Sequence, residues 1–138
     1  MTKSLYVKDC MHENPVKVSP DTSIFEAVSL LMEHKISGLT VVDDQNKVIG
    51  VLSELDCLQH SINSVYNSGT VNSGTVEEHM TSMVDSCGPD DDILSVAQSM
   101  LSKGQRRRPV IKNGELVGQV SCRNLLWATG NFADWRRD

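Results

Sequence analysis

The sequence predicts an α+β fold built from two copies of one β-α-β-β-α unit. Three observations support this prediction: the chain repeats itself at an offset of 69 residues (Val7 to Val76), each copy carries one amphipathic helical stripe, and a hairpin pattern follows each stripe. The chain has 138 residues, so each copy is too short to bury its apolar surface well alone. We therefore expect the two copies to pack pseudo-symmetrically through their sheets into one module.

The internal repeat emerges when the chain is aligned with itself. Identical residues coincide at Val7 and Val76, Met11 and Met80, Pro20 and Pro89, Asp21 and Asp90, Ile24 and Ile93, and Val41 and Val110. After a one-residue gap in a loop, Gly50 and Ser53 coincide with Gly118 and Ser121. These matches predict a first repeat at residues 5–60, a polar and flexible linker at 61–75, a second repeat at 76–130 and a C-terminal tail at 131–138.

One long helix is predicted in each copy. In the first copy, apolar residues follow the helical spacing i, i+3, i+4, i+7 and i+8, at Ile24, Ala27, Val28, Leu31 and Met32. Ser23 and Glu26 have the spacing of a capping box at its start. The second copy repeats the stripe after an acidic run at 90–92, which suits the positive end of a helix dipole, with Ile93, Val96, Ala97, Met100 and Leu101.

Strands and a short helix complete each copy. A hairpin is predicted at residues 39–52 and again at 109–120, where Asn113-Gly114 is a strong turn signal. A further strand is expected before each long helix, at 15–18 and at 83–85. A short helix is expected directly after each hairpin, at 54–59 and at 122–127.

The composition limits the classes of function. The formal net charge of -5 argues against nucleic-acid binding, which needs a broad basic face, although the locally basic segment 103–123 suits a small anion. No apolar stretch approaches the roughly 20 residues of a membrane span, and the N-terminus lacks the apolar core of a signal peptide. Four cysteines at irregular spacing are expected to be reduced thiols. We therefore expect a cytoplasmic protein without membrane or nucleic-acid partners.

A seven-residue motif closes each hairpin: GVLSELD at 50–56 and GQVSCRN at 118–124. Asp56 stands three residues after Ser53, so both side chains face one opening, where a carboxylate can accept hydrogen bonds from both hydroxyls of a ribose. Ser53, at the start of a helix, offers free backbone N–H groups to a phosphate. The same spacing also predicts a plain helix cap, and the two interpretations can coexist. Gly50 leaves room for a close approach or for an unusual backbone angle.

The second copy departs from the first in two ways. Asn124 replaces the aspartate, and a neutral amide holds a ribose hydroxyl without charge assistance, so we predict a weaker or differently selective second site. The run QRRRPV at 105–110 offers guanidinium forks that fit phosphate oxygens, although it can equally be a solvated charge run. Alternation along a strand places Arg106 and Arg108 on one face and Arg107 on the other.

Taken in order, these elements resemble a tandem pair of CBS domains, also called a Bateman module. The resemblance rests on the segments VKDCM and VEEHM, the Pro-Asp pairs before the long helices, and the two hairpins with their closing motifs, and it covers about residues 5–59 and 74–129. It implies a free-standing regulatory module that has no catalytic activity, requires no cofactor and binds AMP, ADP, ATP or S-adenosylmethionine in the cleft between its repeats. It also implies a homodimer that reports adenylate status to an unknown enzyme or transporter.

The resemblance also assigns candidate binding residues. It implies that ribose is held by Ser53 and Asp56 in the first copy and by Ser121 and Asn124 in the second. The run Arg106, Arg107 and Arg108 stands where family members often place phosphate-binding basic residues. Adenine is expected against the first strand and the start of the hairpin, at Val16, Val18, Gly38 and Leu39 in one copy and at Met83, Asp85, Arg107 and Pro109 in the other.

Hypotheses from other classes remain beside this one. The main alternative is a dimerisation or partner-docking module with no bound nucleotide, which uses apolar residues near the C-terminus such as Leu125, Leu126 and Trp127. Cys10 with His12, and Cys57 with His60, offer zinc ligands at spacings unusual for zinc. An enzyme is disfavoured because the sequence has no nucleophile elbow, no P-loop and no GxGxxG motif after a strand.

Overall fold

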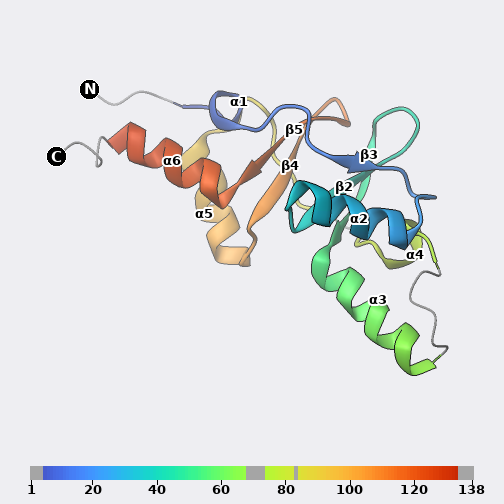
Figure 1. Ribbon diagram of the computed structural model, residues 1–138. Coiled ribbons are helices and arrows are strands. Elements are labelled where there is room, and N and C mark those ends of the chain that lie inside the picture. Colours follow the sequence, from blue (N-terminus) through green and yellow to red (C-terminus); the bar gives the residue numbers. More distant parts are fainter. Residues whose placement is uncertain (1–4, 68–73, 83, 134–138) are drawn as a thin grey trace. The chain divides into compact units, whose positions relative to one another are not determined.

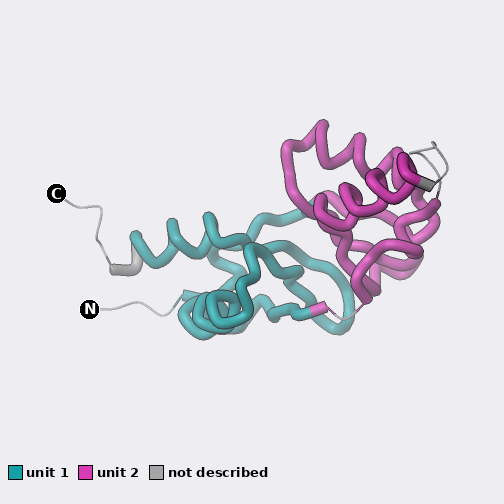
Figure 2. The backbone as a smooth tube through the Cα atoms, turned by 90° about the horizontal axis from the view of Figure 1, so that it is seen from below, with its two compact units in different colours: residues 1–15, 85–138 teal, residues 16–84 magenta. Residues whose placement is uncertain are grey.

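The computed structural model of the chain describes residues 5–67, 74–82 and 84–133 (Figure 1). Its backbone divides into two compact units, unit 1 with residues 1–15 and 85–138 and unit 2 with residues 16–84 (Figure 2). These boundaries differ from those of the sequence repeats. The short helix that leads into each repeat packs in the unit formed by the rest of the other repeat: α1 (Val7–Cys10) belongs to unit 1, and α4 (Val76–His79) belongs to unit 2.

The described residues of unit 2 form a three-stranded sheet and three helices. In chain order its elements are β1 (Lys17–Val18), α2 (Ile24–His34), β2 (Gly38–Val42), β3 (Val48–Ser53), α3 (Glu54–Asn67) and α4. The strand order is β1-β2-β3, with β1 parallel to β2 and β2 antiparallel to β3. Its core joins residues from the sheet, α2, α3 and α4, namely Val18, Ile24, Ala27, Leu31, Leu39, Val41, Leu52, Cys57 and Val76.

Unit 1 repeats this plan with a smaller sheet. Its elements are α1, α5 (Ile93–Lys103), β4 (Arg107–Lys112), β5 (Glu115–Ser121) and α6 (Cys122–Ala133), and β4 pairs antiparallel with β5 around a turn at Asn113 and Gly114. Its core contains Val7, Cys87, Ile93, Val96, Met100, Val110, Val120, Leu125 and Ala128. The α+β fold with two related copies is therefore confirmed.

The strand predicted at 83–85 is wrong for residues 84 and 85, and Met83 lies outside the described residues. The chain pairs with β4 two residues later, where Cys87 forms a parallel bridge to Val110. Asp85 is exposed and its carboxylate binds side chains at the end of α5 instead, which fits the low strand propensity of aspartate. In unit 2 the equivalent segment forms the short strand β1.

The long helices are capped as their sequences predict. The Ser23 hydroxyl accepts the amide of Glu26 at 3.0 Å at the start of α2, and Asp92 accepts the amide of Ser95 at 3.0 Å at the start of α5. The helix α5 ends at Gly104, whose φ of 64° is the left-handed conformation that favours glycine.

The helices that follow the hairpins are longer than predicted. The helix α3 continues to Asn67, beyond the predicted end at 59, and α6 continues to Ala133, beyond the predicted end at 127. No proline or glycine interrupts residues 54–67, and Leu55, Leu58, Ile62 and Val65 recur at helical spacing. The first part of the predicted linker is therefore helical.

Each leading segment also extends a sheet. After α4, the backbone of Thr81 exchanges two hydrogen bonds with Val51 on β3, at 2.9 and 3.0 Å. After α1, His12 and Gln119 on β5 make the equivalent pair at 2.8 and 2.9 Å. Because each sheet receives a strand-like segment from the other sequence repeat, the two repeats depend on each other for their complete hydrogen-bonding pattern.

Candidate functional site

The doubled motif lies at the two junctions where a hairpin strand runs into a helix, β3 into α3 and β5 into α6 (Figure 1). At the first junction the Ser53 amide donates to Asp56 Oδ2 at 2.9 Å, and Ser53 Oγ accepts the Asp56 amide at 3.1 Å. This reciprocal pair is a capping box, so the helix-cap interpretation is confirmed.

The cap leaves part of the Asp56 carboxylate available. Asp56 is half-buried, and within the described chain its hydrogen bond from Ser53 is made to Oδ2, with none to Oδ1. A carboxylate accepts several hydrogen bonds at once, so Oδ1 can take a donor while the cap stays intact. Capping and ligand binding are therefore chemically compatible at this junction.

The second junction has the same geometry with different chemistry. Asn124 Oδ1 accepts both the amide and the hydroxyl of Ser121 at 3.0 Å, and Ser121 Oγ accepts the Asn124 amide at 3.1 Å. Because an N–H donor requires an oxygen opposite it, the amide oxygen of Asn124 must face the cap, and its NH₂ group remains as a donor. The first junction thus offers an acceptor, whereas the second offers a donor.

The strand beside each junction brings a second candidate residue close. Gly38 on β2 pairs with Ser53, and Arg107 on β4 pairs with Ser121 at the equivalent place. The carbonyl of Arg106 accepts the amide of Cys122 at 2.9 Å, which holds this exposed arginine at the start of α6. Predicted residues that come together are therefore Ser53, Asp56 and Gly38 in unit 2, and Ser121, Asn124, Arg106 and Arg107 in unit 1.

Four apolar candidates lie mainly in the protein interior. Val18 and Leu39 belong to the unit 2 core, and Val16 packs against it. Pro109 is buried on β4, where its carbonyl accepts the amide of Cys87 at 3.1 Å. Their packing accounts for these residues without a ligand.

Arg108 lies apart from the junction. It pairs with Val120, a core residue, so its side chain points to the face opposite that of Arg107, as strand alternation predicts. Its guanidinium donates from Nε to Gln105 Oε1 at 2.7 Å and from Nη2 to Ser99 Oγ at 2.8 Å. Arg106 precedes β4, so alternation along the strand does not extend to it.

Asp85 serves a structural connection. Its carboxylate accepts hydrogen bonds from Lys103 Nζ at 2.9 Å and from Gln105 Nε2 at 2.5 Å. These two bonds, with that from Lys103 the larger cause, hold the pKa of Asp85 below its ordinary value. Asp85 therefore joins the segment before Cys87 to the end of α5.

The glycine that begins each motif allows another segment of the chain to pack closely against it. A β-carbon on Gly50 would stand 2.6 Å from Met80 Sδ and 2.9 Å from the Thr81 carbonyl oxygen. Gly118 has the equivalent relationship to Met11 Sδ, at 2.6 Å. Neither glycine has a positive φ. The close approach of another protein segment, and not an unusual backbone angle, therefore explains the glycine in each motif.

The zinc hypothesis has no support in the geometry. Among residues 5–67, 74–82 and 84–133, no three histidine, cysteine, aspartate or glutamate side chains gather as metal ligands. His60 instead packs against His79 with ring centroids 4.2 Å apart and ring planes tilted by 53°, and the four cysteines are free thiols. Across the same described segments, no helix has the length and apolar character needed to cross a bilayer.

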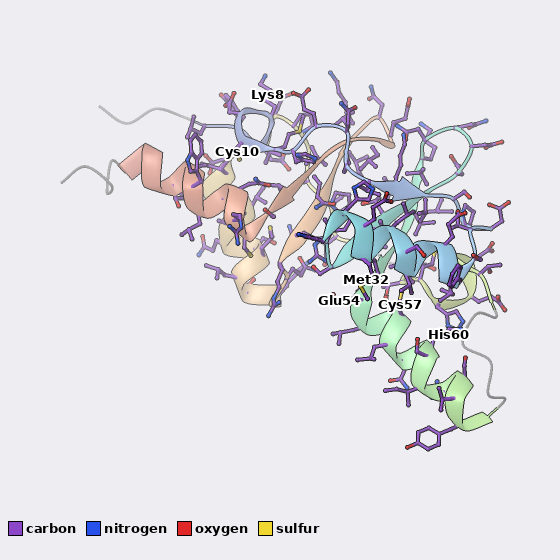
Figure 3. The ribbon with its side chains drawn as sticks, viewed as in Figure 1. Lys8, Cys10, Met32, Glu54, Cys57 and His60 are labelled. Atoms are coloured by element: carbon purple, nitrogen blue, oxygen red, sulfur yellow. The ribbon has the colours of Figure 1, made fainter. Side chains whose placement is uncertain are left out.

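Two apolar grooves lie elsewhere on the units. The α2–α3 groove, of about 320 Å³, is lined in part by Met32, Leu55, Cys57 and Leu58, and Figure 3 shows Met32, Glu54 and Cys57 close together where these helices meet. The α5–α6 groove, also about 320 Å³, occupies the equivalent place in unit 1 and is lined by Ala97, Met100, Leu101, Cys122, Leu125, Leu126 and Thr129.

The chain is similar to known proteins in sequence and in structure. The sequence model of the CBS domain family matches residues 7–63 and 76–130. An uncharacterised 17.7 kDa protein of Acidianus ambivalens is 36% identical over 112 residues, which make up 80% of this chain and 65% of that protein. The chain thus spans slightly less than two thirds of the length of this relative.

Two solved structures are also similar. CBSX2 in complex with AMP is 28% identical, with a TM-score of 0.81 over 93% of this chain and 98% of that one. The CBS domain pair of protein MJ0100, in complex with 5′-methylthioadenosine and S-adenosyl-L-methionine, is 25% identical, with a TM-score of 0.79 over 94% of this chain and 98% of that one.

Proposed function

The chain belongs to the CBS domain family, and from this premise we propose that it is a regulatory module without catalytic activity that binds adenosine-containing ligands. The observation that carries the proposal is the Asp56 carboxylate, which caps α3 through Oδ2 and presents Oδ1 at a half-buried strand–helix junction. The two similar structures support the ligand class, because their bound molecules all contain adenosine or a thioether or sulfonium derivative of it.

Each junction is proposed to bind a ligand group of its own, and the two junctions favour different chemistry. Asp56 accepts hydrogen bonds from the ribose hydroxyls, for which an ionised carboxylate is the stronger acceptor. At the second junction the Asn124 NH₂ group, the start of α6 and the side chains of Arg106 and Arg107 all favour a phosphate or another acceptor. We assign the phosphate to Arg106 and Arg107 and not to Arg108, because Arg108 points to the opposite face of β4.

AMP, ADP and ATP are the proposed ligands, with S-adenosylmethionine as a further candidate, and each acts as a regulatory ligand and not as a required cofactor. In this proposal the protein reports the ligand to a regulated enzyme or transporter. Its four free thiols suit a reducing compartment, so we place it in the cytoplasm.

A melting screen of the full chain tests this proposal. At a hundredfold excess over Kd a ligand stabilises the folded state by about 2.7 kcal/mol, which raises Tm by roughly 10 °C for a domain of this size. We expect a shift with at least one of AMP, ADP, ATP, S-adenosylmethionine and 5′-methylthioadenosine. Asp56→Ala should reduce the shift to what the second junction alone provides, whereas Glu54→Ala, on the same turn of α3 and exposed, should leave it unchanged. A full shift in Asp56→Ala would contradict the ribose assignment.

A second function, assembly with another copy, is favoured by the two apolar grooves. Met32 on α2 and Leu101 on α5 are 74% and 81% exposed at repeat-equivalent positions, and each borders a groove. In a two-fold symmetric dimer the same surface of each copy faces its equivalent, so an exposed apolar groove can pack against the same groove of a second copy. Without nucleotide binding, this surface would make the chain a docking module.

Sedimentation equilibrium of the full chain distinguishes these outcomes. We expect a dimer that dissociates when Leu55→Lys or Leu126→Lys places a charge in either groove. Leu94→Lys is the matched control, because Leu94 is also exposed on α5 but lines neither groove. A monomer at all concentrations, or a dimer insensitive to the groove variants, would contradict the assembly proposal and leave the nucleotide proposal to its own test.

A further inference from the structure

Comparison of the two repeats reveals a polar substitution in the unit 1 interior. At the 69-residue offset, Leu30, Ile36 and Leu39 of unit 2 correspond to Ser99, Gln105 and Arg108 of unit 1. The three apolar residues belong to or pack against the unit 2 core. Their polar counterparts instead form a hydrogen-bonded group in which Arg108 donates to both Gln105 and Ser99.

Arg108 is a buried charge without an ionic partner. Its exposure is 6%, and no carboxylate in the described part of the chain lies within ion-pair distance of it. Its two hydrogen bonds go to neutral oxygens and use two of the five guanidinium N–H groups. Burial of a charge without an ion pair is unfavourable, so a carboxylate that contacted the guanidinium directly would stabilise Arg108.

The guanidinium borders a polar groove of about 370 Å³, which we call the Arg108 groove. Three serines and two aspartates share this lining: Ser86, Ser95, Ser99, Asp91 and Asp92. The Asp91 carboxylate accepts the Gly88 amide at 2.8 Å, and Asp92 caps α5, so neither acid pairs with a basic side chain in the described chain. The Arg108 groove is therefore lined by one positive side chain, Arg108, and by two negative ones, Asp91 and Asp92.

The Arg108 groove is distinct from the strand–helix junction. Arg107 pairs with Ser121 of the motif, whereas Arg108 pairs with Val120 and points to the helix-covered face. A ligand in this groove would therefore leave Ser121 and Asn124 unoccupied.

We propose that the Arg108 groove binds a small zwitterion with the chemistry of an α-amino acid. The planar guanidinium fork pairs with a carboxylate in bidentate fashion, and Asp91 and Asp92 attract the ammonium group. The serine hydroxyls provide neutral hydrogen-bond donors and acceptors for the remaining polar atoms of the ligand. A phosphate dianion fits less well, because both aspartates repel it and the nearby Lys103 is held by Asp85 at 2.9 Å.

Titration calorimetry of the full chain with the standard L-amino acids tests this proposal. We expect at least one of them to bind, and expect its N-acetyl derivative and its methyl ester to bind about tenfold more weakly or worse, because each lacks one of the two charges. Arg108→Leu, which restores the residue of the first repeat, should have the same effect. Asp56→Ala should leave amino-acid binding unchanged, so this result is independent of the adenosine proposal.

A triple variant keeps the proposal testable if Arg108→Leu alone does not fold. Ser99→Leu/Gln105→Ile/Arg108→Leu rebuilds the apolar packing of unit 2, so we expect it to fold and to lose amino-acid binding. Absence of binding by every amino acid in the natural chain would overturn the proposal, as would undiminished binding by the folded triple variant.

Discussion

Met80 lies so close to Gly50 that a β-carbon on this glycine would stand 2.6 Å from the methionine sulfur. The same relationship holds between Met11 and Gly118 in the other unit. In both cases the methionine comes from the leading segment of one repeat and the glycine from the hairpin of the other. The glycine that begins each motif is thus required for packing, whereas the serine and the acidic or amide residue cap the helix that follows.

Gly50→Ala is expected to destabilise the protein by about 1–3 kcal/mol, because Met80 or the Thr81 backbone must shift to admit the added methyl group. Gly88→Ala is the matched control, since a β-carbon there would meet Asp91 at an ordinary 3.6 Å. Urea unfolding measures both variants. If Gly50→Ala and Gly88→Ala had the same free energy of unfolding, Met80 would be moving aside at no cost in free energy.

Ser53→Ala should lower stability by about 1 kcal/mol without any ligand, because the Asp56 amide loses its capping acceptor. Thermal unfolding of the ligand-free protein measures this loss. Asp56→Asn should be much milder, since Asn124 keeps the equivalent cap in the second repeat. If Ser53→Ala left the stability of the ligand-free protein unchanged, water would be replacing the capping hydrogen bond in full.

Asn124→Asp is expected to give the second junction the acceptor chemistry of the first. The aspartate can accept the Ser121 amide as the asparagine does, and its second oxygen then faces outward. We expect tighter adenosine binding in calorimetry, with the additional affinity lost again in Asn124→Ala. Unchanged adenosine affinity would argue that ribose does not approach this junction.

The pKa of Glu78 is lowered by hydrogen bonds from the backbone amide of Thr75, the larger cause, and from its hydroxyl. Because the folded-state pKa lies below the ordinary 4.5, the contribution of this carboxylate to stability is fully present above pH 4.5 and is lost as the pH falls through the lower folded value. Urea unfolding at a series of acidic pH values should therefore show a shrinking difference between the natural chain and Glu78→Ala. A difference that persisted below this window would assign the effect to packing.

The cysteines should differ in reactivity towards a thiol reagent. Burial, with a smaller effect from Asp91, raises the pKa of the Cys87 thiol to about 11, so its reactive thiolate is scarce at neutral pH. Cys122 is exposed at the start of α6 and should react first. Mass spectrometry of partly alkylated protein gives the order, and early labelling of Cys87 would indicate that unit 1 opens readily.

Local features of the fold were predictable because they depend on residues a few positions apart. The stripes of α2 and α5, the Asn113-Gly114 turn and the caps at Ser53 and Ser121 all involve spacings of four residues or fewer. The ends of α3 and α6 were placed too early: no proline follows either predicted end, and in α3 the apolar spacing continues to Val65.

The sequence by itself thus determined the two-copy α+β plan and the chemical identity of the motif residues, since repetition, periodicity and capping are local properties. The tertiary structure alone decided that α1 and α4 join the unit of the opposite repeat, that Met80 meets Gly50, and that Arg108 turns away from the junction to Gln105 and Ser99. These outcomes depend on contacts between segments that lie far apart in the sequence. Such contacts form only when the whole chain packs.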